Sequence, residues 1–177
     1  LAGLLAAEGR LPVARAVSLA SGVAAGLAAV HAAGLVHRDV KPSNILIGSG
    51  IPKLADFSLA RDLAAQMALT ATGIILGTPH YMSPEQCDAR PACACADVYS
   101  LGVVLHHMIV GEPPFPGEDK LEVMMRHLRE TPRPLHVLDP SVPVKLSILV
   151  ERCLEKNPQD RYPDGAALAR ALAGLSV

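Results

Sequence analysis

The stretch HRDVKPSN, residues 37–44, decides how the rest of the chain is interpreted. It places an acid, two cations and an amide side by side, between Val36 and the run ILI at residues 45–47. Val and Ile favour β-structure, so we expect a polar loop that is held at both ends. Loops on rigid supports commonly carry catalytic groups, and this stretch is therefore the first candidate for an active site.

A second acid, Asp56, follows Asn44 after a short apolar run. Phosphoryl transfer needs a carboxylate that accepts the proton of the attacking hydroxyl, and oxygen ligands that hold Mg²⁺ against the nucleotide phosphates. Asp39 suits the first role, and Asn44 with Asp56 suits the second. The HRD triplet alone would also fit a salt-bridged loop in which Asp39 caps a turn, so the assignment depends on further motifs.

Four motifs occur in the order that protein kinases share: residues 37–44, DFS at 56–58, GTPHYMSPE at 77–85 and DVYSLG at 97–102. Their wording resembles the eukaryotic-like Ser/Thr kinases of bacteria over nearly the whole chain. The resemblance implies a mainly α fold with a small β-hairpin, in which residues 1–177 form the large lobe of a kinase domain. No glycine-rich loop, VAIK-type strand or partnering helix Glu precedes the HRD stretch, so we expect a partial domain without the small, ATP-covering lobe.

The resemblance implies roles for the residues of the catalytic loop. Asp39 would act as the base, Lys41 would contact the transferring phosphate, and Asn44 would bind Mg²⁺ together with Asp56. The implied cofactor-binding residues are Lys41, Ser43, Asn44, Leu46 and Asp56. Leu46 would lie beneath the adenine ring, although a plain core leucine fits the sequence equally well. Lys41 would also fit a solvated loop lysine.

The segment 59–76 resembles an activation loop. The implied regulatory and substrate-facing residues are Arg38, Thr70, Thr72 and Thr78. Phosphate on one of the first two Thr residues would be bound by Arg38, although both also fit ordinary loop residues. Thr78 would hydrogen-bond Asp39 and favour Ser or Thr acceptors. Ser58 stands where this family usually has Gly, which restricts the backbone but leaves the metal-binding acid in place.

A further set of residues is implied to hold the lobe together: His37, Phe57, Glu85, Asp97 and Arg161. Glu85 would pair with Arg161 from the run NPQDR at 157–161. Asp97 begins an apolar stretch, and it would cap the helix 98–110, hold the backbone of the catalytic loop, or do both.

Helical spacing and helix-ending residues predict the other elements. We expect helices at residues 1–10, 12–34, 98–110, 118–129, 144–156 and 164–175, and a hairpin at 45–55. Residues 16–36 contain no charged side chain and could span a bilayer by length. Because Ser18, Ser21 and His31 interrupt them and one face is richer in apolar residues, we expect a buried core helix and no membrane segment.

Composition narrows the class of protein. The formal net charge is −1, which argues against a general nucleic-acid binder. Four cysteines without a secretory pattern favour a reduced, cytoplasmic setting over a disulfide framework. Cys93 and Cys95 lack a second pair at zinc spacing, so we expect them to be incidental.

The sequence therefore predicts a Ser/Thr protein kinase that uses ATP and Mg²⁺ and acts on protein substrates, with a kinase–kinase dimer as a possible assembly. Two other functions stay open. A pseudokinase or scaffold would keep the fold only to bind partners, and an inactive fragment would have no activity of its own.

Overall fold

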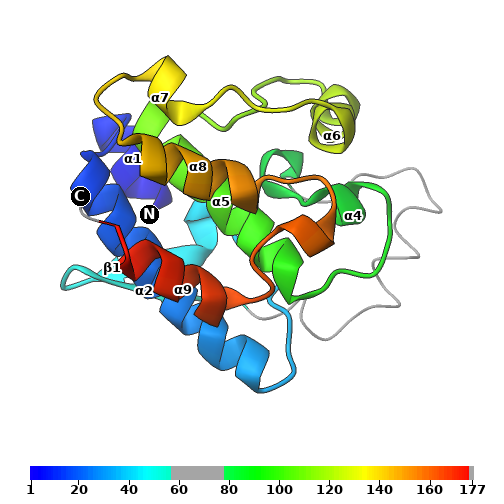
Figure 1. Cartoon of the computed structure of the whole chain (residues 1–177), viewed down its shortest axis with the longest axis horizontal. Helices are drawn as coiled ribbons and strands as arrows, with labels where there is room; N and C mark the ends of the chain where they lie inside the picture. Colours follow the sequence, from blue (N-terminus) through cyan, green and yellow to red (C-terminus); the bar gives the residue numbers. More distant parts are fainter. Residues whose placement is uncertain (57–77, 176–177) are drawn as a thin grey trace.

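The computed structural model describes residues 1–56 and 78–175, which fold mainly into helices with one two-stranded hairpin (Figure 1). This is the fold class that the sequence predicts. In chain order the elements are α1 (Ala2–Glu8), α2 (Val13–Ala32), η1 (Pro42–Asn44), β1 (Ile45–Gly48), β2 (Ile51–Leu54), η3 (Pro79–Tyr81), α4 (Pro84–Cys87), α5 (Ala94–Val110), α6 (Lys120–Arg129), α7 (Leu135–Leu138), α8 (Val144–Cys153), η4 (Pro158–Asp160) and α9 (Gly165–Ala173).

Helix α5 forms the centre of the molecule. Fourteen of its 17 residues are buried, and it contacts α2, α8 and α9. Gly102 permits the close approach of α8, because a Cβ at this position would lie 2.6 Å from the Cβ of Cys153. A central apolar helix is what the sequence predicts, but its start was placed wrongly.

The first turn of α5 begins at Ala94, after an extended residue at Cys93. Asp97 therefore lies inside the first turn, and the prediction that it caps the helix is wrong. The physical reason is the run Ala94-Cys95-Ala96, which continues the helix towards the N-terminus with small residues, two of them good helix formers. The carboxylate of Asp97 therefore does not cap α5. It accepts hydrogen bonds from the loop at residues 37–44 instead.

Helix α2 packs against α5, α9 and β2. Its apolar residues are buried at helical spacing: Ala16, Val17, Leu19, Ala20, Val23, Ala24 and Leu27. By length and composition alone α2 could cross a membrane, a test that core helices also pass. Its packing on three neighbouring elements matches the core helix predicted from the sequence.

The hairpin has two unlike faces, which follow from its register. Leu46 pairs with Lys53, and Gly48 pairs with Ile51; these four residues share one face, and all four are exposed. The residues of the other face are buried or half-buried and lie on α2, where Gly22 and Gly26 face Pro52 and Leu54. The hairpin is thus fixed to the core on one side and open on the other.

Several elements differ in detail from the sequence-based prediction. Helix α8 ends at Cys153, three residues before the predicted end, and the short helices α4 and α7 lie in stretches for which the sequence predicts no helix. The largest correction concerns Cys93 and Cys95, which form a disulfide instead of being incidental. Cys87 and Cys153 are free, buried thiols.

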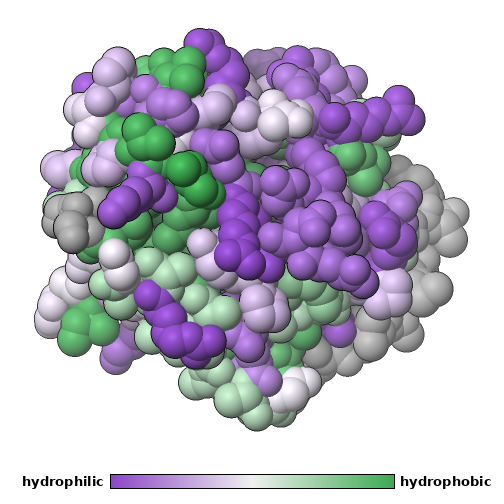
Figure 2. All heavy atoms as spheres, viewed as in Figure 1, coloured by the Kyte–Doolittle hydropathy of each residue, from purple (hydrophilic) through white to green (hydrophobic). Residues whose placement is uncertain are grey.

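One face of the molecule is mixed in character. In Figure 2 hydrophilic side chains cover much of its right half, and apolar side chains gather at the upper left. The exposed apolar residues of α7 and α8 are Val137, Val144 and Ile148. Apolar atoms make up much of the surface of any folded protein, so this face does not by itself indicate a binding site.

A polar cluster is buried between α5 and α6. His127 Nε2 donates to the carbonyl of His80 at 3.1 Å, and its Nδ1 accepts from the Tyr99 hydroxyl at 2.8 Å. The Lys156 ammonium donates to the carbonyl of His127 at 2.9 Å and lies 4.8 Å from the ring centroid of Phe115. Burial lowers the pKa of His127 to about 3 and that of Lys156 to about 8, with a neighbouring cation acting in the same direction in both cases.

The approach of α9 to α2 supplies a first test of the fold. A Cβ at Gly165 would lie 2.6 Å from the amide nitrogen of Ala28 and 2.8 Å from the carbonyl oxygen of Ala24. Backbone atoms cannot move aside cheaply, so Gly165→Ala should destabilise the chain by about 1–3 kcal/mol. Gly3→Ala is the matched control, because nothing lies within 4 Å of its Cβ position. Urea denaturation of both variants checks this, and equal midpoints would contradict the close packing.

The cluster around His127 predicts a dependence of stability on pH. The folded chain keeps His127 neutral down to about pH 3, whereas the unfolded chain protonates it near its ordinary pKa. Stability should therefore be full above pH 6.5 and fall as the pH drops towards 3, by up to about 1.4 kcal/mol per pH unit for this one group. The His127→Gln variant should lack this contribution, so its free energy of unfolding should change less steeply with pH between 6.5 and 4. Denaturation series over that pH range measure the difference. An unchanged slope would show that the ring is not held neutral.

Candidate active site

The loop at residues 37–44 connects α2 with β1, and its backbone is bound from two sides. The carboxylate of Asp97 accepts the amide N–H of His37 at Oδ2 and that of Arg38 at Oδ1, both at 2.7 Å. From the opposite direction, the side-chain amide of Gln86 donates to the carbonyl of Arg38 at 2.7 Å. Arg38 has a φ of 68°, which is uncommon for a residue with a Cβ. These bonds hold the loop in that strained conformation.

The carboxylate of Asp39 lies among two polar neighbours from the same loop. Its Oδ2 accepts the side-chain amide of Asn44 at 2.7 Å and forms an ion pair with the Lys41 ammonium at 2.7 Å. Among the described residues, the hydrogen bond from Asn44 and the ion-pair contact with Lys41 are both made at Oδ2. Asp39 is half-buried, so its Oδ1 is left for an incoming hydroxyl.

His37 connects the loop to the hairpin. Its Nδ1 accepts the amide N–H of Asp39 at 3.3 Å, so the proton of the neutral ring lies on Nε2, which donates to the carbonyl of Ala55 at 3.2 Å. The amide of Ala55 in turn donates to the carbonyl of Asn44 at 2.9 Å. Asp56 therefore follows directly after a residue that is bound to both ends of the loop, and it is exposed with a φ of 62°.

The residues of the predicted metal site have the donor chemistry that Mg²⁺ requires. The side-chain nitrogen of Asn44 donates to both the carbonyl and the carboxylate of Asp39, at 2.9 and 2.7 Å. These two bonds fix the amide, so its oxygen, which also accepts from the Ser43 hydroxyl at 3.5 Å, is the atom that could bind a cation. Asp56, the residue after Ala55, adds an exposed carboxylate. Carboxylate and amide oxygens are the hard ligands that suit Mg²⁺.

Of the other residues predicted for the site, some lie within the described part of the chain and some lie outside it. Ser43 is exposed, with its hydroxyl 3.5 Å from the Asn44 oxygen, and Leu46 is 57% exposed on the open face of the hairpin. Thr78 is exposed at the start of η3 and makes no hydrogen bond to Asp39 within the described part of the chain, so the predicted bond is not present. Phe57, Ser58, Thr70 and Thr72 lie outside the described residues.

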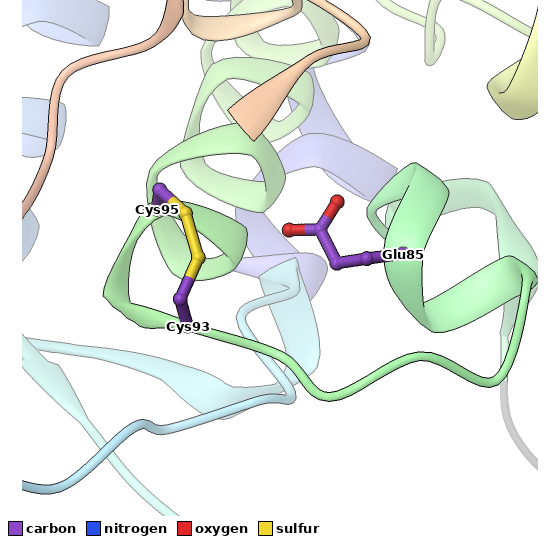
Figure 3. Close-up of side chains that lie close together, drawn as sticks. All are labelled: Glu85, Cys93 and Cys95. Atoms are coloured by element: carbon purple, nitrogen blue, oxygen red, sulfur yellow. A yellow bond between two sulfur atoms is a disulfide. The ribbon is translucent and has the colours of Figure 1, made fainter. Parts of the chain in front are cut away.

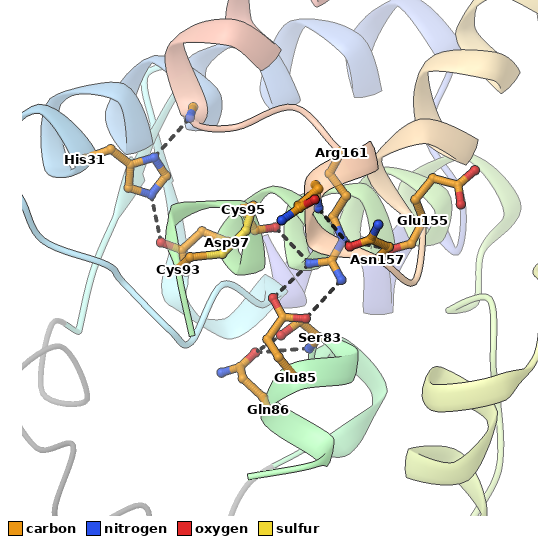
Figure 4. Close-up of a disulfide and its surroundings, with 12 residues drawn as sticks. His31, Ser83, Glu85, Gln86, Cys93, Cys95, Asp97, Glu155, Asn157 and Arg161 are labelled. Atoms are coloured by element: carbon orange, nitrogen blue, oxygen red, sulfur yellow. Dashed lines mark hydrogen bonds and ion pairs between the residues drawn. A yellow bond between two sulfur atoms is a disulfide. The ribbon is translucent and has the colours of Figure 1, made fainter. Parts of the chain in front are cut away.

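Glu85 and Arg161 form a buried, bidentate ion pair (Figure 4). Both nitrogen–oxygen distances are 2.9 Å, and each residue is 2% exposed. The guanidinium also donates to the backbone carbonyls of Cys95, Glu155 and Lys156. All five of its N–H groups are thereby used, which connects α4, the start of α5 and the turn after α8.

His31 is a partner of Asp97 that the sequence analysis missed. Its Nδ1 accepts the amide N–H of Gly165 at 3.0 Å, so its Nε2 carries the proton and donates to Asp97 Oδ2 at 2.9 Å. Figure 4 shows the imidazole of His31 and its bond to Asp97. Its signal in the sequence is a polar side chain near the end of a mostly apolar helix, which could have been interpreted as a buried hydrogen-bonding group.

The geometry defines a class of protein: a rigid loop presents a carboxylate, an ammonium and an amide beside a second acid, which is the arrangement used for phosphoryl transfer. Residues 1–171 match the family described as "Protein kinase domain", and the chain belongs to this family.

The curated relatives include bacterial enzymes. The chain is 39% identical to the serine/threonine-protein kinase PknA of Corynebacterium glutamicum, over all of this chain and 37% of that protein. It is 43% identical to PknL of Mycobacterium tuberculosis, over 98% of this chain and 43% of that protein, and 46% identical to PkaA of Streptomyces coelicolor, over 91% and 29%. The chain thus spans less than half the length of these relatives.

The Glu85–Arg161 pair supplies a test of what holds the site in place. Arg161→Ala would leave a buried carboxylate without its counter-ion, and we expect a loss of about 3–5 kcal/mol in the free energy of unfolding. Arg15→Ala is the matched control, since its pair with Glu8 is exposed and should contribute at most about 1 kcal/mol. Chemical denaturation of both variants measures the difference, and similar losses would show that the buried pair is not needed.

Proposed function

We propose that the domain containing this chain transfers the γ-phosphoryl group of ATP to Ser or Thr hydroxyls of proteins, with Mg²⁺ as cofactor. The observation that carries the proposal is the environment of Asp39. Its Oδ2 is bound by Lys41 and Asn44, and its backbone is held by Asp97 through the preceding residues. A carboxylate that is positioned in this way on one oxygen presents the other in a fixed direction.

In the proposed reaction, the oxygen of the substrate hydroxyl forms a bond to the γ-phosphorus, and Asp39 Oδ1 accepts the proton of that hydroxyl. The bond between that phosphorus and the bridging oxygen breaks, and ADP leaves with the electron pair. The Lys41 ammonium, 2.7 Å from Asp39, provides a mobile positive charge for the transferring group. Bound Mg²⁺ would neutralise phosphate charge, and Asn44 with Asp56 would hold it.

The open face of the hairpin supports the nucleotide part of the proposal. Leu46 and Ile51 are 57% and 62% exposed there, next to the loop that ends at Asn44. Exposed apolar side chains on a hairpin that is fixed to the core by its other face form a suitable floor for the adenine ring. Thr78 and the threonines at 70 and 72 remain our candidates for substrate recognition and regulation.

The names of the bacterial kinases that the chain resembles suggest a protein Ser/Thr substrate. A cytoplasmic location and association between two copies are further parts of the proposal. A scaffold without catalysis is less well supported, because Asp39, Asn44 and Asp56 are all retained. A binding-only domain would not need a base, a phosphate-contacting lysine and two oxygen ligands together.

The test is Asp39→Asn in the full-length protein. The substitution keeps the size of the side chain but removes its ability to take up a proton, so turnover should fall by about 10²–10⁴-fold. Affinity for Mg-ATP should change little, because the ligand residues remain. Glu8→Gln, in the exposed pair with Arg15, is the control for charge removal. Turnover within threefold of the parent would exclude Asp39 as the base.

A further inference from the structure

The disulfide between Cys93 and Cys95 lies at the start of the central helix (Figure 4). Cys93 is the extended residue before α5 and is exposed, whereas Cys95 lies in the first turn and is 7% exposed. Cys93 is therefore the residue of the bridge that a reagent in solvent can reach, while Cys95 is covered by protein. The remaining cysteines, Cys87 and Cys153, are buried thiols.

The disulfide lies beside both charged contacts that support the catalytic loop. Figure 3 shows the Glu85 carboxylate near the two sulfurs, and the ligand atoms of the three residues lie within 4.8 Å of one another. The carbonyl of Cys95 accepts from Arg161 at 3.2 Å. Asp97, which holds the loop backbone, follows two residues later in the same turn. The bridge thus constrains the piece of backbone from which both contacts are made.

Stabilisation of the fold is a poor explanation for this disulfide. It joins residues only two positions apart, and a bridge removes less chain entropy from the unfolded state the shorter the loop that it closes. In reducing compartments, disulfides are usually transient and serve catalysis or redox sensing. Exposed disulfides are also the more easily reduced ones. Its exposure, its short loop and its position all favour a reversible role.

We propose that Cys93 and Cys95 form a reversible redox modification site whose state controls how firmly Asp97 holds the catalytic loop. The proposal goes beyond phosphoryl transfer, and its test does not depend on kinase activity. The co-reactant is a dithiol reductant, such as a reduced dithiol protein or dithiothreitol.

The chemistry is a two-step exchange. A thiolate of the reductant attacks the exposed sulfur of Cys93, the bond between the two protein sulfurs breaks, and Cys95 leaves as a thiolate that takes up a proton. The second thiol of the reductant then attacks the mixed disulfide and releases Cys93, which is also protonated. The reductant gives up two electrons and becomes a disulfide, while the protein gains two thiols.

Opening the bridge should loosen the first turn of α5. Cys93 makes no side-chain cap for this helix, so the first N–H groups have no capping side chain to hold them when the covalent constraint is removed. Asp97 lies in that turn, and its two bonds to the amides of His37 and Arg38 become easier to break. The effect of reduction is therefore expected at the loop, far from the sulfurs in sequence.

Hydrogen exchange of this chain, with and without dithiothreitol, tests the proposal. We expect several-fold faster exchange at the amides of His37 and Arg38 after reduction, together with new alkylation of Cys93 by iodoacetamide in mass spectra. Cys93→Ala cannot form the bridge and should exchange at the faster rate in both conditions. Cys87→Ala removes a thiol outside the bridge and should respond to dithiothreitol like the parent.

Three results would overturn the proposal. Alkylation of Cys93 before any reductant is added would show that the bridge is absent. Resistance of the folded chain to dithiothreitol would show that the bridge is not reversible. Equal exchange at His37 and Arg38 in the oxidised, reduced and Cys93→Ala chains would show that the bridge is not coupled to the loop. None of these outcomes bears on whether the domain transfers phosphate.

Discussion

The hydrogen bonds from the amides of His37 and Arg38 to the buried carboxylate of Asp97 are the contact on which the site depends. Arg38 is held at a positive φ, a conformation that costs of order 1–3 kcal/mol for a residue with a side chain. Two hydrogen bonds to a charged acceptor contribute about 1.5–3 kcal/mol each, which is enough to offset that strain. Because the backbone turns at Arg38, the next carboxylate, Asp39, faces Lys41 and Asn44 across the loop.

Asp97 is itself held by groups from distant parts of the chain. A buried carboxylate is costly unless its oxygens are hydrogen-bonded, and here a third bond comes from His31, near the end of α2. The same imidazole accepts the first amide of α9, from Gly165. Three helices therefore meet at one carboxylate, and the position of the catalytic loop is set by the packing of the whole lobe.

The fold and much of the site could be predicted because their signals are local or belong to a motif. Apolar spacing marks α2 and α5, and the β-formers around residues 48–50 mark the hairpin. Glu85 and Arg161 lie far apart in the sequence, but each belongs to a motif of one family, which predicts their pairing. The resemblance to a family therefore predicts this long-range pair, which the spacing of apolar residues alone cannot predict.

What could not be predicted are contacts whose partners carry no signal in sequence. His31 is one of several polar residues in a mostly apolar helix, and its two partners come from α5 and α9, which are distant in sequence. Cys93 and Cys95 match no known spacing, and whether they bridge depends on where α5 begins. That start was misplaced because Asp97 looks like a cap, whereas the alanines before it extend the helix.

The charged contacts at the start of α5 explain how an almost wholly apolar helix is given one orientation. Burial of apolar surface is non-directional, so a helix that is apolar nearly all round can rotate or slide at little cost in hydrophobic energy. Two contacts restrict the position of α5: Arg161 donates to the carbonyl of Cys95, and Asp97 accepts the amides of the loop. Both can form in only one rotation and one register of the helix. The apolar side chains of α5 thus supply the stability of the core, while the polar groups of its first turn fix where the helix lies and so where Asp39 points.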